Sequence, residues 1–331
     1  MNNTPIVLAL SLLSSSAFAI TDGTNVDWVH DFDDMVKNHC TGMVVGGDQV
    51  LTANHCMDLT GITFADGRIM DAVTRDNHPQ YKYSGSGDQY DVSVWTLPHA
   101  AKVQNIHYFA DLNTQTVAVD YSVKAYGFGD GVSVNNPLAY AELIVNKLPS
   151  SSTPSLKTLF VSNPISGDTI QGDSGGIWMH DDRIFALTSS GIVGGVSDST
   201  DLSQAKDFLL EKINGWHYPT VLKGNGTQTI KIQSLHQNTV SDTAYVSGDV
   251  AITGGSCQTK STIDAFETCT YQLEVNGSGQ LHLTDHEVID INPQDAPLVV
   301  TTPPSSSGGS GGSLGFLSLF GLALLGRFRK Q

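Results

Sequence analysis

The chain has 331 residues, of which 40% are hydrophobic, so after removal of a leader it can form two domains with sizeable cores. Its 33 acidic and 17 basic residues give a formal charge of −16, which argues against nucleic-acid binding. The acidity favours solubility and attraction of basic substrates, and it also fits a secreted or saline setting.

Residues 1–19 have the composition of an export signal. An apolar run at 6–13 is followed by Ala17-Phe18-Ala19, a small-residue cleavage site, although the usual basic residues before the run are absent. The alternative, a retained membrane helix, is disfavoured because the run is too short to span a bilayer. We therefore expect a signal peptide over 1–19 and a mature chain that begins at Ile20.

A candidate general base follows the first predicted hairpin. The residues at 43–50, with Gly46-Gly47 in the middle, predict two strands around a tight turn, and His55 lies just past the second strand. Imidazole suits proton transfer because its ordinary pKa lies near neutrality. The alternative is a surface or structural role, since the chain has 11 histidines.

Asp91 is the candidate for the carboxylate that orients this base. Alternation after Asp91 predicts a half-buried strand up to 97, and a carboxylate at the start of such a strand can be buried against an imidazole. Asp88 is its rival. Asp88 lies in the Ser/Gly-rich loop 84–88, where a solvated turn residue is the default interpretation.

The sequence Gly-Asp-Ser-Gly-Gly at 172–176 indicates a candidate nucleophile, Ser174. A glycine-rich loop also lets the backbone N–H groups of Gly172 and Ser174 point at one spot, as an oxyanion hole requires. Gly and Ser together also mark ordinary loops. The indication therefore depends on the base and the carboxylate found elsewhere in the chain.

The composition changes after residue 218. Short runs typical of strands alternate with Gly, Asn and Ser turns, and they lie at 228–232, 243–246, 250–252, 270–275 and 281–283. We expect a small β-sandwich over 219–300, a size at which a disulfide helps stability. It holds no catalytic constellation, so a structural cap is the default, with protease positioning, exporter contact or substrate binding as alternatives.

The C-terminal tail is a separate module. Residues 301–313 form a Pro/Ser/Gly linker, 314–325 are apolar, and 327–330 are mostly basic. This order resembles the bacterial GlyGly-CTERM sorting tail. The resemblance implies removal by a rhomboid-type protease, transient membrane contact through the tail at 314–331, and export through type II secretion and sorting machinery. The alternative is a permanent C-terminal anchor.

Three blocks, at 52–56, 91–94 and 172–176, resemble the signature blocks of the chymotrypsin/trypsin family of serine endopeptidases. The order His, Asp, Ser is also that of the family, whereas subtilisins and α/β-hydrolases use other orders. The resemblance covers residues 20–218. It implies an all-β fold, a chymotrypsin-like double antiparallel β-barrel with a C-terminal helix at 205–213, followed here by the β-sandwich. It also implies that Ser174 attacks, His55 carries the proton and Asp91 stabilises the imidazolium.

Further positions match the family. Cys40 and Cys56 have the spacing of the disulfide that closes the histidine loop, and the remaining pair most simply joins Cys257 to Cys269. No further ligand cluster supports a metal site at the first pair, and we expect no metal and no cofactor. Ser189-Ser190-Gly191 resembles the segment at which Ser189 and Gly191 would bind the substrate backbone. Ser190 replaces an aromatic residue usual there.

Asp168 lies six residues before Ser174, the offset of the aspartate that selects Arg or Lys in trypsin-like members. The alternative is a surface turn at 166–169. Ile170 departs from the family because a cysteine usually stands there, so we expect packing to hold the pocket wall. Cleavage after Ala19 would expose an Ile20 start that resembles the mature family N-terminus. The resemblance implies that the new amine pairs with Asp173.

Together these features predict an exported serine endopeptidase acting on protein or peptide substrates after Arg or Lys. It would be secreted or held at the cell surface, through the periplasm of a Gram-negative bacterium, and we expect no nucleic-acid partner. The alternatives are a catalytically silent binding protein on the same fold and an esterase that uses the same nucleophile.

Overall fold

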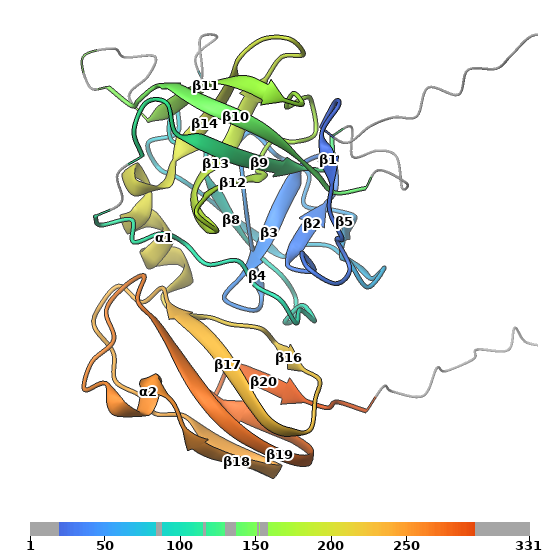
Figure 1. Ribbon diagram of the computed structural model, residues 1–331, viewed down its shortest axis with the longest axis vertical. Coiled ribbons are helices and arrows are strands. Elements are labelled where there is room, and N and C mark those ends of the chain that lie inside the picture. Colours follow the sequence, from blue (N-terminus) through green and yellow to red (C-terminus); the bar gives the residue numbers. More distant parts are fainter. Residues whose placement is uncertain are drawn as a thin grey trace, which may run out of the picture. The chain divides into compact units, whose positions relative to one another are not determined.

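The computed structural model describes residues 20–83, 88–114, 117–129, 137–150, 152 and 158–294 (Figure 1). The signal peptide expected at 1–19, the linker at 301–313 and the tail at 314–331 lie outside these residues. Among the described residues, no helix is long and apolar enough to cross a membrane.

The first sheet is antiparallel, and its strands follow the order β6-β5-β2-β3-β4-β8-β7. The hairpin predicted at 43–50 is confirmed, because β3 and β4 pair around Gly46 and Gly47, which both have positive φ. The strands are β2 (Met35–Lys37), β3 (Thr41–Val45), β4 (Gln49–Thr52), β5 (Ile62–Thr63), β6 (Ile69–Met70), β7 (Thr74–Asn77) and β8 (Ser93–Thr96).

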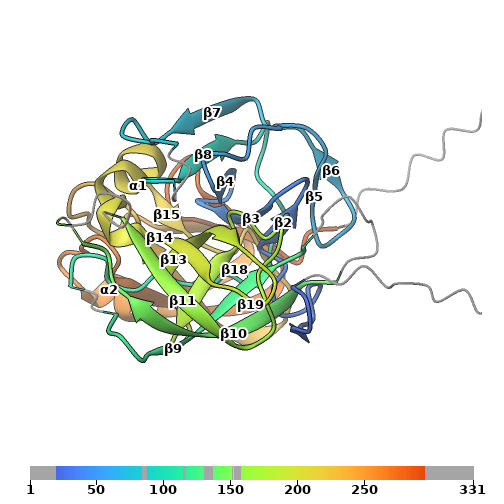
Figure 2. The same ribbon diagram turned by 90° about the horizontal axis from the view of Figure 1, so that it is seen from above.

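The second sheet closes into a six-stranded barrel because β9 pairs with both β10 and β12. Its order is β10-β11-β14-β13-β12-β9, and β1 adds to the outer edge of β10. Figure 2 shows the two barrels on opposite sides of this part of the chain. The strands are β1 (Thr24–Asn25), β9 (Ser122–Gly127), β10 (Ala139–Lys147), β11 (Leu159–Ser166), β12 (Ile177–His180), β13 (Arg183–Gly191) and β14 (Ser197–Asp201).

The helix expected at 205–213 is present as α1 (Lys206–Ile213), after a short 3-10 helix, η2 (Leu202–Gln204). Its apolar face, Phe208 to Leu210, is buried in a core cluster that also takes residues from both barrels. Asn214 ends the helix in the left-handed conformation. The predicted chymotrypsin-like double β-barrel with a C-terminal helix is therefore confirmed.

The C-terminal domain is a six-stranded sheet around its own apolar core. Its elements are β15 (Trp216–His217), β16 (Val221–Leu222), β17 (Gly226–Ser234), β18 (Tyr245–Gly254), α2 (Ser256–Thr259), β19 (Thr268–His282) and β20 (Val288–Ile291). The long strand β19 pairs with β17 through its first half and with β20 through its second, while β18 runs along its other edge. Because β15 pairs with β17, this sheet already begins at Trp216.

Two pairs of short strands expected in this domain are each one long strand. The runs at 243–246 and 250–252 fall within or next to β18. The runs at 270–275 and 281–283 fall within or next to β19. The expectation was wrong because it treated the intervening glycines as turns. Gly248 instead has a positive φ at a bulge, and it pairs with Gly279, whose missing side chain lets the two backbones approach.

One buried side chain joins the C-terminal domain to the segment between the barrels. Gln233 of β17 is fully buried, and its Oε1 accepts a hydrogen bond from the N–H of Phe109 at 2.9 Å. Its Nε2 donates to the carbonyls of Phe109 (2.9 Å) and Phe266 (2.8 Å). Leu235 and Phe266 also belong to the core cluster of the barrels and α1, so the described residues up to Pro293 form one compact unit.

Candidate active site

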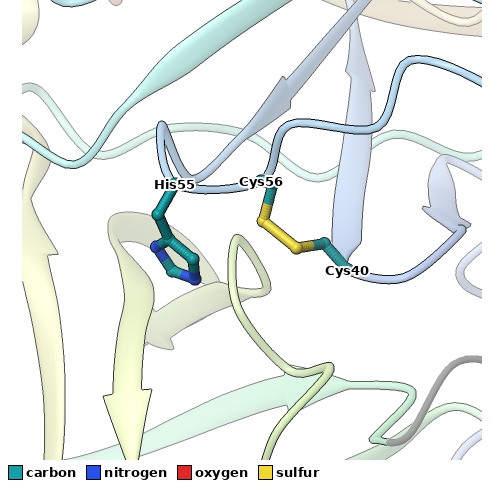
Figure 3. A group of neighbouring side chains, drawn as sticks. All are labelled: Cys40, His55 and Cys56. Atoms are coloured by element: carbon teal, nitrogen blue, oxygen red, sulfur yellow. A yellow bond between two sulfur atoms is a disulfide. The ribbon is translucent and has the colours of Figure 1, made fainter.

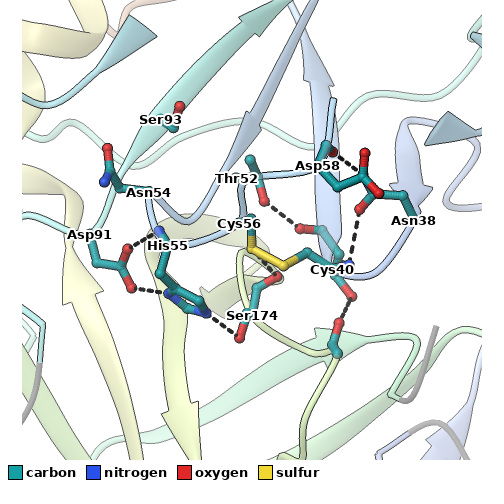
Figure 4. Close-up of a disulfide and its surroundings, with 12 residues drawn as sticks. Asn38, Cys40, Thr52, Asn54, His55, Cys56, Asp58, Asp91, Ser93 and Ser174 are labelled. Atoms are coloured by element: carbon teal, nitrogen blue, oxygen red, sulfur yellow. Dashed lines mark hydrogen bonds and ion pairs between the residues drawn. A yellow bond between two sulfur atoms is a disulfide. The ribbon is translucent and has the colours of Figure 1, made fainter. Parts of the chain in front are cut away.

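The strand pairing brings His55 and Asp91 together. Thr52 at the end of β4 pairs with Ser93 at the start of β8, so the turn that carries His55 lies beside Asp91, two residues before β8. Ser174 comes from the loop between β11 and β12 of the other barrel. The three residues predicted as a triad therefore meet where the two barrels face each other (Figure 4).

A chain of hydrogen bonds connects these three side chains. Nδ1 of His55 lies 2.7 Å from Oδ2 of Asp91, and Nε2 of His55 lies 2.8 Å from Oγ of Ser174. Because a carboxylate accepts only, Nδ1 must carry the proton and Nε2 is left to accept from the serine hydroxyl. This is the geometry in which imidazole acts as a general base toward a serine.

Asp91 is completely buried, and three donors satisfy its carboxylate. The backbone N–H of His55 donates to Oδ1 at 2.9 Å, and the Ser189 hydroxyl donates to Oδ2 at 2.7 Å, in addition to the imidazole. Burial acts to lower the pKa of His55, but the hydrogen bond and charge of Asp91, with a contribution from Asp88, raise it above its ordinary value.

Asp88, the rival carboxylate, lies beside the pair. An oxygen of Asp88 is within 4.8 Å of a ligand atom of His55 and of Asp91, while its Oδ2 accepts a hydrogen bond from the Tyr81 hydroxyl at 2.8 Å. The direct bond to the imidazole belongs to Asp91. Asp88 therefore acts on His55 through its charge, and no sequence feature pointed to Tyr81.

The loop at 172–176 is clamped against the first barrel. The N–H of Thr41 donates to the carbonyl of Ser174 at 2.9 Å, and the Thr41 hydroxyl donates to the carbonyl of Gly172 at 3.0 Å. Gly175 has φ of +81°, and a Cβ there would collide with the Thr52 hydroxyl and the Thr41 carbonyl. Within the described chain, the N–H groups of Gly172 and Ser174 donate to no acceptor, which leaves both free for an oxyanion.

The predicted disulfide between Cys40 and Cys56 is present next to His55 (Figure 3). It joins the start of β3 to the histidine turn, so it limits movement of the imidazole relative to the loop that Thr41 holds. Both sulfur atoms are bonded to each other and are not thiolates for a metal. The second predicted bridge, Cys257–Cys269, is also present.

The residue after Asp168, Thr169, is bonded to strand β14. Oγ of Thr169 lies 2.6 Å from Oγ of Ser197 on β14, and both side chains are buried. This bond adds to the packing that was expected to hold the chain here in place of the missing disulfide at Ile170. The Asp168 carboxylate is partly exposed and accepts a hydrogen bond from the N–H of Gly194 at 3.0 Å.

The residue expected to start the mature chain lies close to Asp168 along the backbone pairing. Ile20 is 1% exposed and packs in the core of the second barrel, while the backbones of Thr21 and Asp168 exchange two hydrogen bonds of 3.1 and 2.9 Å. In the full chain the nitrogen of Ile20 is a peptide nitrogen and offers no positive charge.

Asp173 is fully buried beneath the nucleophile loop. Its carboxylate accepts hydrogen bonds from the N–H groups of Gly129 (2.6 Å) and Ile170 (2.8 Å), and no cation pairs with it among the described residues. Burial raises its pKa to about 7 despite these two bonds. A buried carboxyl group in this state lacks the partner that would stabilise its charge.

Comparison with known proteins identifies a family. A sequence model of the trypsin family matches residues 22–208, which is more than half of the chain. No curated protein sequence matches the chain.

Solved structures also resemble the chain. The VesB protease of Vibrio cholerae is 20% identical, with a TM-score of 0.46 over 79% of this chain and 94% of that one. The secreted serine protease VesC of Vibrio cholerae is 16% identical, with a TM-score of 0.48 over 81% of this chain and 70% of that one. A kallikrein-related peptidase 10 complex with Zn²⁺ is 17% identical, with a TM-score of 0.44 over 55% of this chain and 95% of that one.

Proposed function

Because the chain belongs to the trypsin family of serine endopeptidases, we propose that His55, Asp91 and Ser174 are its catalytic triad. The observation that carries this proposal is the continuous series of hydrogen bonds from Asp91 through the imidazole to the serine hydroxyl. A silent binding protein would not need a serine hydroxyl bonded to an imidazole that is itself oriented by a buried carboxylate.

In the proposed reaction, Oγ of Ser174 attacks the carbonyl carbon of the scissile bond while its proton passes to Nε2 of His55. The N–H groups of Gly172 and Ser174 stabilise the oxyanion, and Asp91 stabilises the imidazolium. His55 then gives the proton to the leaving amine as the C–N bond breaks. Water repeats the sequence on the acyl-enzyme and releases the carboxylic acid with Ser174 restored.

We propose that Asp168 selects substrates with Arg or Lys before the scissile bond. Its support is the position six residues before Ser174 and a carboxylate that is partly exposed and bonded to only one backbone N–H. A carboxylate of this kind gains a charge-assisted hydrogen bond from a guanidinium or ammonium group. Ser189 and Gly191 of β13 would present the substrate backbone beside it.

Removal of the signal peptide is the proposed activating step. The α-amine of Ile20 would then pair with Asp173, whose buried carboxylate has no cationic partner among the described residues. The proposed domain division is a protease domain at 20–218 and a β-sandwich domain at 219–300, followed by the linker and the sorting tail. Two disulfides and the leader at 1–19 support secretion.

Tripeptide amides ending in Arg, Leu or Ala test the function directly. Wild-type protein should release the amine from the Arg substrate, and Ser174→Ala should lose nearly all turnover. Ser190→Ala, an exposed serine one residue beyond the triad contact Ser189, is the matched control and should retain turnover. Hydrolysis of esters without amides would favour the esterase, and no turnover by wild type would favour the binding protein.

A further inference from the structure

A cavity separate from the triad lies at the junction of the barrels and the C-terminal domain. It has a volume of about 480 Å³, and its polar lining includes His107 and Tyr108 from the segment between the barrels, Arg183 at the start of β13, and Lys231 from β17. Phe32, Tyr126 and Met179 supply an apolar side. No lining residue belongs to the triad, the oxyanion loop or the Asp168 pocket, so this cavity has no role in the reaction above.

Two cations in this cavity share one aromatic ring. Nζ of Lys231 lies 4.2 Å from the centre of the Tyr108 ring, and the guanidinium carbon of Arg183 lies 5.5 Å from the same centre. The Tyr108 hydroxyl donates to the backbone carbonyl of Lys231 at 2.9 Å and so fixes the ring. In the part of the chain described, neither cation lies within ion-pair distance of a carboxylate.

The juxtaposition of these cations is unfavourable without an anion. Burial, and then the charge of Arg183, lowers the pKa of Lys231, which means that the cavity destabilises its positive charge. Asp181 and Asp182 also line the cavity, but among the described residues no carboxylate lies within ion-pair distance of Lys231 or Arg183. The arrangement therefore suits a negative group that comes from outside the chain.

His107 is the third basic side chain in the cavity. Its Nδ1 lies 3.0 Å from both oxygens of the buried Asp34, and Phe32 stacks on its ring with centres 4.2 Å apart. Burial acts to lower the pKa of His107, but the charge and hydrogen bond of Asp34, with Asp33 and Asp182, raise it above its ordinary value. Since Asp34 accepts from Nδ1, Nε2 carries a proton only when the ring is an imidazolium, and in that form it can donate to a ligand.

We propose that this cavity binds the free carboxylate end of a short peptide. The carboxylate would accept hydrogen bonds from Arg183 and Lys231, and from His107 when that ring is an imidazolium. The last side chain of the peptide would pack on the apolar side. Asp181 and Asp182 at the exposed end of the lining carry the opposite charge. They would repel a compact polyanion but accept hydrogen bonds from the peptide's own N–H groups. The volume is of the size that holds a small organic ligand.

Binding is tested with the Ser174→Ala protein, so that hydrolysis cannot remove the ligand. N-acetyl-Ala-Phe with a free carboxylate and the same peptide as its C-terminal amide are titrated by calorimetry. The acid should bind at a single site. The amide should bind more weakly by at least about tenfold, because it lacks the charge-assisted bonds. Arg183→Gln and Lys231→Gln should each weaken binding of the acid by about tenfold.

Lys102→Gln is the matched control, because it removes one exposed positive charge from the same inter-barrel segment outside the cavity lining. The proposal is wrong if acid and amide bind equally, if the cavity variants bind like Lys102→Gln, or if sulfate displaces the peptide with equal affinity. Nuclear magnetic resonance shifts confined to Tyr108 and Lys231 on adding the acid would support it without any variant. Turnover by wild-type protein tests the triad separately, so the two proposals fail independently.

Discussion

The hydroxyl of Ser189 donates a 2.7 Å hydrogen bond to Oδ2 of Asp91, the same oxygen that lies 2.7 Å from Nδ1 of His55. Asp91 is 0% exposed, so protein donors replace all of the water that its charge would otherwise bind. The residue first considered for contact with the substrate backbone thus also supports the buried carboxylate.

Ser189→Ala should therefore destabilise the protein by about 1–3 kcal/mol, because one acceptor of a buried carboxylate loses its partner. It should also reduce kcat/KM, since Asp91 would hold the imidazole less firmly. Urea unfolding and peptide-amide turnover measure the two effects. Ser190→Ala, on the exposed neighbour, should change neither; equal effects in the two variants would remove the special role of Ser189.

The acid limb of the pH–rate profile should respond to Asp88. The pKa of His55 is raised above its ordinary value, and general-base catalysis needs neutral imidazole, so kcat/KM should rise as pH increases through this raised pKa. Removing the Asp88 charge in Asp88→Asn should shift the limb to lower pH. Asp66→Asn, a carboxylate outside the site, is the control. An unshifted limb in Asp88→Asn would contradict the electrostatic contribution.

The sequence was sufficient for the three catalytic candidates because each lies in a short local block with a fixed order along the chain. It could not predict contacts that link distant positions. Ser189 and Asp91 are 98 residues apart, Thr169 and Ser197 are 28 apart, and Gln233 and Phe109 are 124 apart. Each contact depends on how strands are placed after folding, and serine, threonine and glutamine occur throughout the chain.

Gln233→Ala should be strongly destabilising, because it removes three buried hydrogen bonds and leaves backbone groups of Phe109 and Phe266 unpaired. We expect a loss of about 3 kcal/mol or more. Chemical denaturation followed by tryptophan fluorescence measures it. Gln272→Ala, on the exposed face of β19, is the control and should have little effect. Similar stabilities for the two variants would show that Gln233 does not support the domain junction.

The start of the mature chain should determine how stability depends on pH. With one Met placed before Ile20, Asp173 has no ammonium partner, and burial holds its pKa at about 7, above the unfolded value near 4. Its stabilising contribution is then present below pH 4 and lost as pH rises through about 7, by about 2–4 kcal/mol. A chain that begins at Ile20 should lose less stability over this pH range, because its ammonium group pairs with the ionised carboxylate.

Unfolding in urea at pH 5 and pH 8 measures this difference between the two N-termini. Asp173→Asn should abolish it, since the amide does not titrate. If both N-termini give the same dependence on pH with Asp173 intact, the proposed pair with Ile20 does not form.

Asp168→Ser tests the specificity proposal. Its carboxylate accepts one backbone hydrogen bond, from Gly194, and remains partly exposed, so the substitution should leave the fold intact. Loss of the charge should reduce kcat/KM for the Arg and Lys amides by about 100-fold or more, because the substrate cation would lose its partner. Turnover of the Leu amide should change little or increase.

Asp198→Ser on strand β14 is the control. It removes a different carboxylate, which accepts a hydrogen bond from the Ser190 hydroxyl at 3.2 Å. Equal losses for the Arg and Leu amides in Asp168→Ser, or the selective loss appearing in Asp198→Ser instead, would show that Asp168 does not select the substrate.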